Sequence, residues 1–301
     1  MFRHFIISFL AKRHKKAILK WVENPIKSQN KILKKLITSA EKTIFGREHS
    51  FKAISSYSSF KKNVPVVDYE DIKPYINKII QGEADVLWPG TPKYFAVTSG
   101  TTSGEKYIPM TTQSLPYLLN GAKDALLMYI ANTGNTKVLK GRQIFLQGSP
   151  TLNKKGRIET GRLSGISAHH VPFYLKPSIL PSKKTNSIEN WEKKVDAIVK
   201  ETIAQDMRIL SGIPPWLQMY FEKLQEATRQ PVGTIFKNLQ LLIYGGASFA
   251  PYKKKFQKLI GRKIDTIEVY PASEGFFAFQ DSQESEDLLL MLNSGIFYEF
   301  I

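Results

Sequence analysis

The sequence predicts an α/β fold with layered, mostly parallel sheets and flanking helices. Short apolar runs alternate with helical patterns from about residue 94 onward, which is the pattern of strands joined by crossover helices. Two of these runs, 94–97 and 239–244, are almost uninterrupted, as in strands buried on both faces of a parallel sheet. The chain has 301 residues, 42% of them hydrophobic, so it can bury a large core.

The front of the chain predicts a basic helical lead-in over residues 1–62. Helical spacing indicates one helix that passes through 17–21 and stops at Asn24-Pro25, and a second over about 28–44. The apolar run 1–11 is followed at once by Lys12-Arg13, without a small-residue cleavage site, so it predicts an amphipathic helix instead of a signal peptide.

Most of the positive charge lies in this lead-in. Residues 1–62 hold 15 Lys and Arg against three Glu, so they carry +12 of the net charge of +17. Such a surface can contact nucleic acid or an anionic membrane. The simpler interpretation, which we favour, is that Lys31, Lys34 and Lys35 form the solvated face of a helix, because no nucleic-acid motif accompanies the charge.

The pattern of residues 63–301 predicts the α/β part of the chain, in which strands alternate with helices. Asp68 is a plausible cap for a helix, and residues 148–187 predict mainly loop. Alternation over 288–301 predicts an antiparallel hairpin. Helices are expected at about 69–81, 112–130, 189–205, 216–228 and 251–260, and strands at 64–67, 94–97, 143–147, 208–210, 239–244 and 265–270.

A loop rich in glycine and hydroxyl side chains is expected at 98–104, between a strand and a helix. Ser, Thr and Gly fill these positions and Lys106 follows them. Glycines let backbone amides approach phosphate oxygens, hydroxyls add donors, and Lys106 adds a positive charge. The segment is not a Walker loop, because G-x-x-x-x-G-K-[ST] is absent. It predicts a phosphate-binding loop.

Two further loops follow predicted strands. The paired glycines of Tyr244-Gly-Gly-Ala-Ser248 would let a flat ligand lie on the backbone, although a tight turn alone needs no ligand. In Tyr270-Pro-Ala-Ser-Glu274, an aromatic ring could stack on a base and a carboxylate could hold Mg²⁺. Ligands bind outside the carboxyl ends of strands in open α/β sheets, so we expect the three loops to converge there.

Together, these motifs resemble the adenylate-forming superfamily. Within it, the chain is most similar to the auxin-responsive Gretchen-Hagen-type acyl-acid amido synthetases, from about residue 24 onward. The resemblance rests on Val64-Pro-Val-Val-Asp-Tyr-Glu-Asp, Gly82-Glu-Ala-Asp-Val-Leu-Trp-Pro-Gly, Ser99-Gly-Thr-Thr-Ser-Gly-Glu-Lys-Tyr-Ile-Pro, Gly212-Ile-Pro-Pro-Trp-Leu and Tyr270-Pro-Ala-Ser-Glu-Gly-Phe-Phe.

The resemblance implies an enzyme that uses ATP and Mg²⁺ to activate a carboxylic acid as an acyl-adenylate and then transfers the acyl group to an amine, typically an amino acid. It implies the fold of the N-terminal domain of adenylate-forming enzymes, and it assigns roles to residues. Ser99, Gly100, Thr101 and Thr102, with Gly104 and Lys106, would bind phosphates; Gly246 and Ala247 would border the adenine, with Tyr270 packed on it; Ser273 would contact the α-phosphate and Glu274 would hold Mg²⁺.

The chain departs from the family pattern at its end. Relatives continue beyond the equivalent of residue 301 with a Tyr-Arg-x-Gly-Asp-like motif and a mobile lid domain, so we expect an incomplete N-terminal domain. Two alternatives stay open: an acyl-CoA-type ligase with a thiol acceptor, and a non-catalytic remnant that binds nucleotide or polyanion. The absence of Cys and of any apolar stretch of roughly 18–20 residues predicts a cytoplasmic protein without a membrane span.

Overall fold

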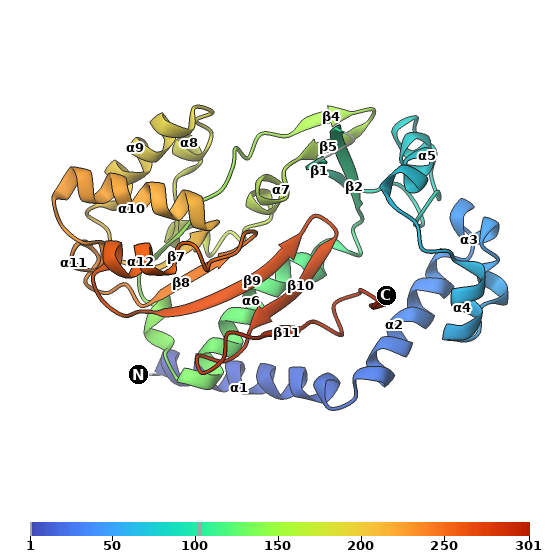
Figure 1. The fold of residues 1–301 in the computed structure, drawn as a ribbon, viewed down its shortest axis with the longest axis horizontal. Helices are drawn as coiled ribbons and strands as arrows, with labels where there is room; N and C mark the ends of the chain where they lie inside the picture. The colour runs from blue at the N-terminus through green and yellow to red at the C-terminus, as the bar shows by residue number, and fades with distance from the viewer. Residues whose placement is uncertain (1, 101–103) are drawn as a thin grey trace.

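The computed structural model describes residues 2–100 and 104–301, and the larger of its two sheets has seven strands (Figure 1). Five strands run parallel, while β10 and β11 are antiparallel at one edge. The prediction of a mostly parallel sheet is confirmed. The strands, in sheet order, are β11 (Leu288–Leu290), β10 (Gly275–Gln280), β9 (Asp265–Ala272), β8 (Leu241–Gly245), β7 (Met207–Gly212), β3 (Arg142–Phe145) and β6 (Ile179–Leu180).

The smaller sheet is mixed. Its central strand β1 (Tyr94–Gly100) pairs antiparallel with β2 (Gly104–Met110) and parallel with β5 (Ile158–Gly161), which in turn pairs antiparallel with β4 (Asn153–Lys155). The strand predicted at 94–97 therefore has a parallel neighbour on one side only. The segment 148–187, predicted to be mainly loop, contributes two strands to this sheet as well as β6.

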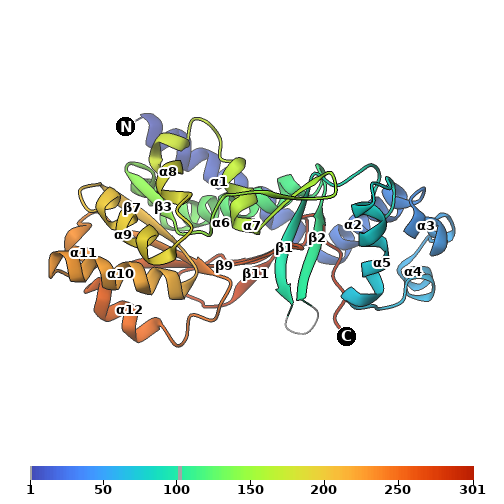
Figure 2. The ribbon, with the colours of Figure 1, turned by 90° about the horizontal axis from the view of Figure 1, so that it is seen from above.

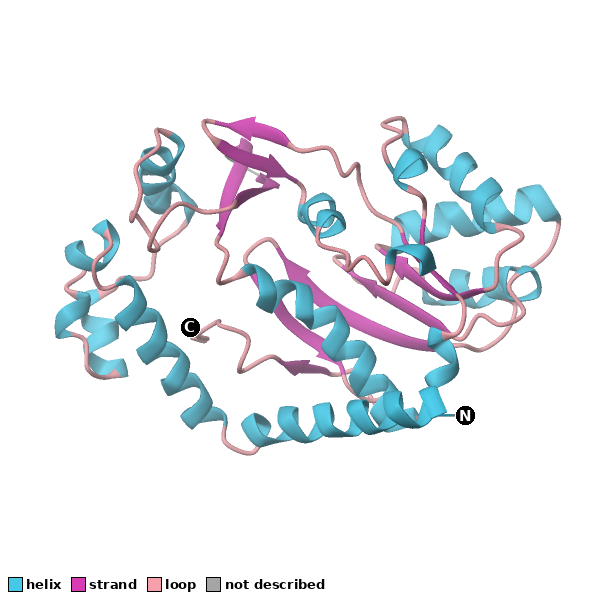
Figure 3. Cartoon of the chain, turned by 180° about the vertical axis from the view of Figure 1, so that it is seen from behind, coloured by secondary structure: helices cyan, strands magenta, loops and turns pink. Residues whose placement is uncertain are grey.

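Helices cover both faces of the larger sheet (Figure 3). Ile209 packs with α6, whereas its neighbour Leu210 packs with α9, α10 and α12, because successive side chains of a strand point to opposite faces. The helices are α1 (Phe2–Val22), α2 (Pro25–Ala40), α3 (Ile44–Glu48), α4 (Tyr57–Asn63), α5 (Tyr69–Ile80), α6 (Leu115–Thr133), α7 (Leu163–His169), α8 (Lys183–Asn186), α9 (Trp191–Thr202), α10 (Pro214–Thr228), α11 (Val232–Ile235) and α12 (Lys253–Ile260), with 3₁₀ turns η1 (Phe51–Ala53), η2 (Thr136–Leu139) and η3 (Lys176–Ser178).

The front of the chain is helical, as predicted. The side chain of Asp68 accepts hydrogen bonds from the amides of Glu70 and Asp71 and so caps α5, as expected from its sequence. In α2, Lys31, Lys34 and Lys35 are exposed while the apolar side chains between them face inward, which is the amphipathic arrangement predicted for this helix.

The hairpin predicted over 288–301 is wrong. Only Leu288–Leu290 forms a strand, and it pairs with β10. Beyond it the chain turns at Gly295, where φ is +78°, and runs to α2. There the Gln29 side chain donates to the carbonyls of Leu292 and Ile296 and accepts from the Tyr298 amide, so a distant side chain satisfies backbone groups that a partner strand would otherwise pair.

The helix α6 lies directly against the sheet at Gly121. A Cβ atom at this position would lie 2.1 Å from Cγ of Phe276 on β10, and Phe276 is buried. Residues of α6 belong to one hydrophobic cluster with α1, with the smaller sheet through Tyr94 and Ala96, and with the larger sheet. The helix therefore joins the lead-in and both sheets into one core.

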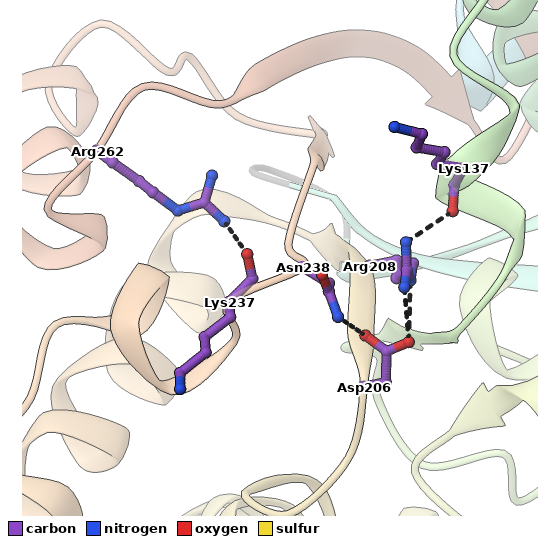
Figure 4. A network of polar contacts seen from close by, with 6 residues as sticks. All are labelled: Lys137, Asp206, Arg208, Lys237, Asn238 and Arg262. Atoms are coloured by element: carbon purple, nitrogen blue, oxygen red, sulfur yellow. Dashed lines mark hydrogen bonds and ion pairs between the residues drawn. The ribbon is translucent and has the colours of Figure 1, made fainter.

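A polar network lies at the amino ends of β7 and β8, the edge opposite to their carboxyl ends (Figure 4). The Asp206 carboxylate accepts two hydrogen bonds from Arg208 (3.0 and 2.9 Å) and one from Asn238 (3.0 Å). Burial alone would raise the pKa of Asp206, but these hydrogen bonds and the Arg208 charge outweigh it and hold the pKa below its usual value. The carboxylate thus joins the connections that precede β7 and β8.

Within residues 2–100 and 104–301, the structure contains no helix that is both long enough and apolar enough to cross a membrane.

We expect Gly121→Ala to lower the free energy of unfolding by about 1–3 kcal/mol, because the new methyl group meets the Phe276 ring, although Ala favours a helix over Gly by about 1 kcal/mol. Urea denaturation measures the change. Phe276→Leu in the Gly121→Ala background should recover part of the loss, since it removes the ring. An unchanged or raised urea midpoint for Gly121→Ala would contradict the described packing.

The Asp206 network predicts a pH-dependent loss of stability. Its pKa is lower in the folded state, so its contribution is present above the unfolded pKa of about 3.9 and disappears as the pH falls through the folded value. The side chain is 44% exposed, so solvent screening limits the contribution to about 1 kcal/mol. Asp206→Asn should therefore differ from wild type near neutral pH and converge with it in acid. Asp196→Asn is the control, and a difference that persists at low pH contradicts the assignment.

Candidate functional site

The candidate site lies at the carboxyl edge of the larger sheet. Gly212 of β7 is paired with Tyr244 of β8, and Gly245 with Val269 of β9, so three neighbouring parallel strands end close together. Two of the three predicted loops, 245–248 and 271–275, leave the sheet at this edge. Their convergence agrees with the expectation drawn from parallel sheet topology.

Packing on both sides fixes the backbone after β8. A Cβ atom on Gly245 would lie 2.1 Å from the Val269 carbonyl oxygen, so only glycine fits there. Gly246 adopts φ +77°, which favours glycine, and the Phe249 ring stacks on Tyr244 with centroids 4.0 Å apart. Gly246 and Ala247 are therefore exposed on a short segment anchored at both ends, where a flat ligand can approach the backbone.

Tyr244 keeps its proton over the physiological pH range. Burial, followed by the nearby carboxylate of Glu268, raises the pKa of this phenol to about 12. Burial, and then the charge of Glu286, also raises the pKa of Glu268. The register of β8 and β9 thus places a neutral phenol opposite a carboxyl group that is harder to ionise than usual.

Tyr270 lies on β9, one residue beyond Val269, which forms the last pair with β8. The residue is 55% exposed. The pairing of β9 with β10 shifts between Phe276 and Ala278, and this bulge brings the Phe277 ring to within 5.4 Å of the Tyr270 ring, measured between centroids. The Phe277 ring therefore supports Tyr270 while much of its surface stays open to a ligand.

Ser273 and Glu274 form a two-residue turn between β9 and β10, because Ala272 pairs with Gly275 across it. Ser273 is half-buried and Glu274 is exposed. In the part of the chain that the structure describes, no group of three or more His, Cys, Asp or Glu could hold a metal ion. A single carboxylate fits Mg²⁺ only if phosphate oxygens and water supply the other ligands.

The predicted phosphate loop is not a loop between a strand and a helix. Ser99 and Gly100 belong to β1, and Gly104 and Lys106 belong to β2, so 98–106 is largely a hairpin with Thr98 opposite Lys106. Thr101 and Thr102 lie outside the described residues. The strand β2 therefore lies between the predicted loop and α6, which begins at Leu115, so the amino terminus of α6 does not follow the loop directly.

Lys106 contacts an aromatic ring from another element. Its Nζ lies 5.2 Å from the centroid of the Tyr69 ring on α5, and the Tyr69 hydroxyl accepts a hydrogen bond from the Tyr107 amide (2.8 Å). The ammonium group predicted to bind phosphate is thus held beside a ring, two residue pairs from the Gly100–Gly104 end of the hairpin.

The hairpin and the carboxyl-edge loops belong to different sheets. Figures 1 and 2 show that the β9–β10 turn lies on the side of the larger sheet that faces the β1–β2 hairpin. Tyr94 and Ala96 of β1 share a hydrophobic cluster with Ile267 of β9, which joins the two sheets.

One contributor to this edge was missed from the sequence. Lys194 of α9 is 1% exposed, and its Nζ donates to the carbonyls of Gln147 (3.0 Å), which follows β3, and Asn186 (2.7 Å). Burial lowers its pKa to about 8. The available signal was helical spacing, because Lys194 falls on the same face as the buried Val195 and Ile198.

A family model, described as the GH3 family N-terminal domain, matches residues 14–264. The match includes the β1–β2 hairpin and the glycine pair after β8, and it ends before Tyr270.

Among curated proteins, the chain is similar to the Arabidopsis thaliana 4-substituted benzoates-glutamate ligase GH3.12, with 37% identity over 103 residues, which are 33% of this chain and 18% of that protein. The chain thus matches less than a fifth of that relative's length.

Among solved structures, the GH3.15 acyl acid amido synthetase matches with a TM-score of 0.74 at 13% identity, over 92% of this chain and 60% of that chain. A 2-hydroxyisobutyryl-CoA ligase in complex with 2-HIB-AMP and CoA matches with a TM-score of 0.53 at 12% identity, over 82% and 48%. These likenesses show the adenylate-forming fold, as the sequence predicted.

We expect the same substitution to have different consequences at Gly245, the last residue of β8, and at Gly246, which follows it. Gly245→Ala forces a methyl group against the Val269 carbonyl and should lower the free energy of unfolding by about 3 kcal/mol or more. Gly246→Ala adds a strained left-handed residue, and its methyl group meets only the end of the Ile213 side chain, at 3.2 Å from Cγ2, so it should cost about 1 kcal/mol. Urea denaturation of the matched pair measures both, and equal losses would contradict the described junction between β8 and β9.

Proposed function

Because the chain belongs to the GH3 family, we propose that the protein acts as an acyl-acid amido synthetase, activating a carboxylic acid with ATP and transferring the acyl group to an amine, with an amino acid as the proposed acceptor. In the first step a carboxylate oxygen attacks the α-phosphorus of ATP and pyrophosphate leaves. In the second, the amine attacks the acyl carbon and AMP leaves. The name of GH3.12 gives it an acid and an amino acid, 4-substituted benzoates and glutamate, and that of GH3.15 gives it an acyl acid, which supports this choice of substrates.

The observation that carries the proposal is the arrangement at the carboxyl edge of the larger sheet. An exposed glycine segment, an exposed aromatic ring and a hydroxyl–carboxylate turn leave adjacent strands there, facing the β1–β2 hairpin. Such a reaction needs positioning and charge neutralisation more than a covalent nucleophile. We propose the roles implied by the family resemblance: Ser99, Gly100, Thr101, Thr102, Gly104 and Lys106 for phosphates, Gly246, Ala247 and Tyr270 for adenine, Ser273 for the α-phosphate and Glu274 for Mg²⁺.

Mg²⁺ would neutralise phosphate charge during the first step. Glu274 offers a hard oxygen ligand on a two-residue turn, and Ser273 offers a hydroxyl beside it. Residues 63–301 are proposed to form the nucleotide-binding part, with residues 1–62 as its helical lead-in. A cytoplasmic location stays a prediction.

We expect Glu274→Gln to lower the rate of acid-dependent pyrophosphate release by about 100-fold and to raise the Mg²⁺ concentration needed for half-maximal rate, because the amide is a poorer metal ligand. The matched control is Glu284→Gln, an exposed glutamate away from this edge, which should leave the rate unchanged. The role of Glu274 is wrong if its variant keeps the wild-type rate and Mg²⁺ dependence.

Product analysis distinguishes the proposed reaction from its alternatives. Amide formation with an amino acid supports the proposal, whereas a thioester formed with CoA favours an acyl-CoA-type ligase. Salt-sensitive binding of a polyanion, with neither pyrophosphate release nor stabilisation by ATP, favours a non-catalytic binding protein.

A further inference from the structure

The helix α1 is firmly held along one side. Ala11 and Ile18 are buried against the core, in the cluster that contains α6. Three polar contacts add to this packing: His4 Nδ1 with Thr136 Oγ1 at 2.6 Å, Lys15 Nζ with Asn132 Oδ1 at 2.6 Å, and His14 Nε2 with Asp124 Oδ1 at 3.0 Å. The orientation of α1 is therefore fixed, and so is the face that it turns outward.

The first half of the outward face is apolar. Phe5 is 73% exposed, Ile6 41%, Phe9 59% and Leu10 50%. Their spacing of one, four and five residues places them on one side of the helix. They precede residues 14–264, which the family model matches.

The second half of the same face is basic. The exposed residues here are Lys12, Arg13, Lys16 and Lys20. At 3.6 residues per turn they lie on the same side of the helix as Phe5 and Phe9. The helix contains no Asp or Glu. An apolar stretch thus passes directly into a cationic one along a single exposed helix face.

We propose that α1 binds the surface of an anionic phospholipid bilayer, with Phe5 and Phe9 inserted at the boundary between headgroups and acyl chains, and with Lys12, Arg13 and Lys16 on the headgroups. The binding of a helix in this interface grows with the apolar area that it buries and with its attraction to anionic lipids, and the exposed face of α1 offers both groups one after the other. The described part of the chain has no helix able to cross the bilayer, so α1 would hold the protein on the surface.

Charge complementarity decides between possible occupants of this face. A second copy of the chain would bring two cationic faces together, which like-charge repulsion opposes. Nucleic acid would satisfy the cations but would leave the aliphatic side chains of Ile6 and Leu10 without an apolar partner. An anionic bilayer supplies both negative headgroups and an apolar layer.

Co-sedimentation of the full chain with phosphatidylcholine vesicles, with and without phosphatidylglycerol, tests the proposal. Wild type should sediment with the anionic vesicles and remain in solution with the neutral ones. Phe5→Ser/Phe9→Ser should weaken binding about tenfold or more, and Lys12→Ser/Arg13→Ser/Lys16→Ser about fivefold for each charge removed. Each variant tests one half of the face, so either can decide if the other fails to fold.

Matched controls remove similar groups elsewhere. Phe173 and Tyr174 are 82% and 67% exposed, and Phe173→Ser/Tyr174→Ser should bind vesicles as wild type does. Lys193→Ser/Lys200→Ser/Lys254→Ser removes three exposed cations away from α1 and should have a smaller effect than the α1 charge variant.

Failure of wild type to bind anionic vesicles overturns the proposal, as does binding that both α1 variants retain. A dimer in solution that Phe5→Ser/Phe9→Ser converts to monomer, without vesicle binding, assigns the face to a second copy. Tighter binding to duplex DNA than to vesicles assigns it to nucleic acid. Amide synthesis is measured separately, so failure of membrane binding leaves the proposed function untouched.

Discussion

The close approach of α6 to β10 is the constraint on which the rest of the structure depends. With no side chain at Gly121, the helix axis can lie against the Phe276 ring, and this sets the position of β10 relative to the core. The same helix packs against α1 on another side and joins β1 to the cluster beneath the larger sheet. Protein interiors are close-packed, so a displacement of α6 would be transmitted to the lead-in, to both sheets and to the β9–β10 turn.

The parallel core could be predicted from sequence because strands buried on both faces leave a strong apolar signal. Leu241 and Leu242 point to opposite faces, and both are buried. The hairpin at 94–110 could not be predicted from sequence, because a run of Ser, Thr and Gly is typical of loops. Its pairing also depends on contacts with α5 and β5. The path after β11 also escaped prediction, since it depends on Gln29, which lies 263 residues away in sequence from Leu292.

Some features of the candidate site could likewise be predicted from the sequence, whereas others depend on tertiary packing. Sequence reasoning proposed Gly246, Ala247, Tyr270, Ser273 and Glu274 as site residues. Strand order brings them to one edge, because consecutive parallel strands with crossover helices end on the same side. The positions of Lys106 beside Tyr69 and of Lys194 beneath Gln147 arise from tertiary packing between elements far apart in the chain. Local patterns carry no information about such contacts, although the inward position of Lys194 on its helix was visible.

The turn and bulge between β9 and β10 also restrict how this part of the sequence can evolve. Two residues separate Ala272 from Gly275, and the bulge then directs Phe276 to α6 and Phe277 to Tyr270. Since side chains alternate along a strand, inserting or deleting one residue here would exchange these two rings and pull one out of the core. Evolution of this protein should therefore tolerate substitutions between Tyr270 and Phe277 but not insertions or deletions there.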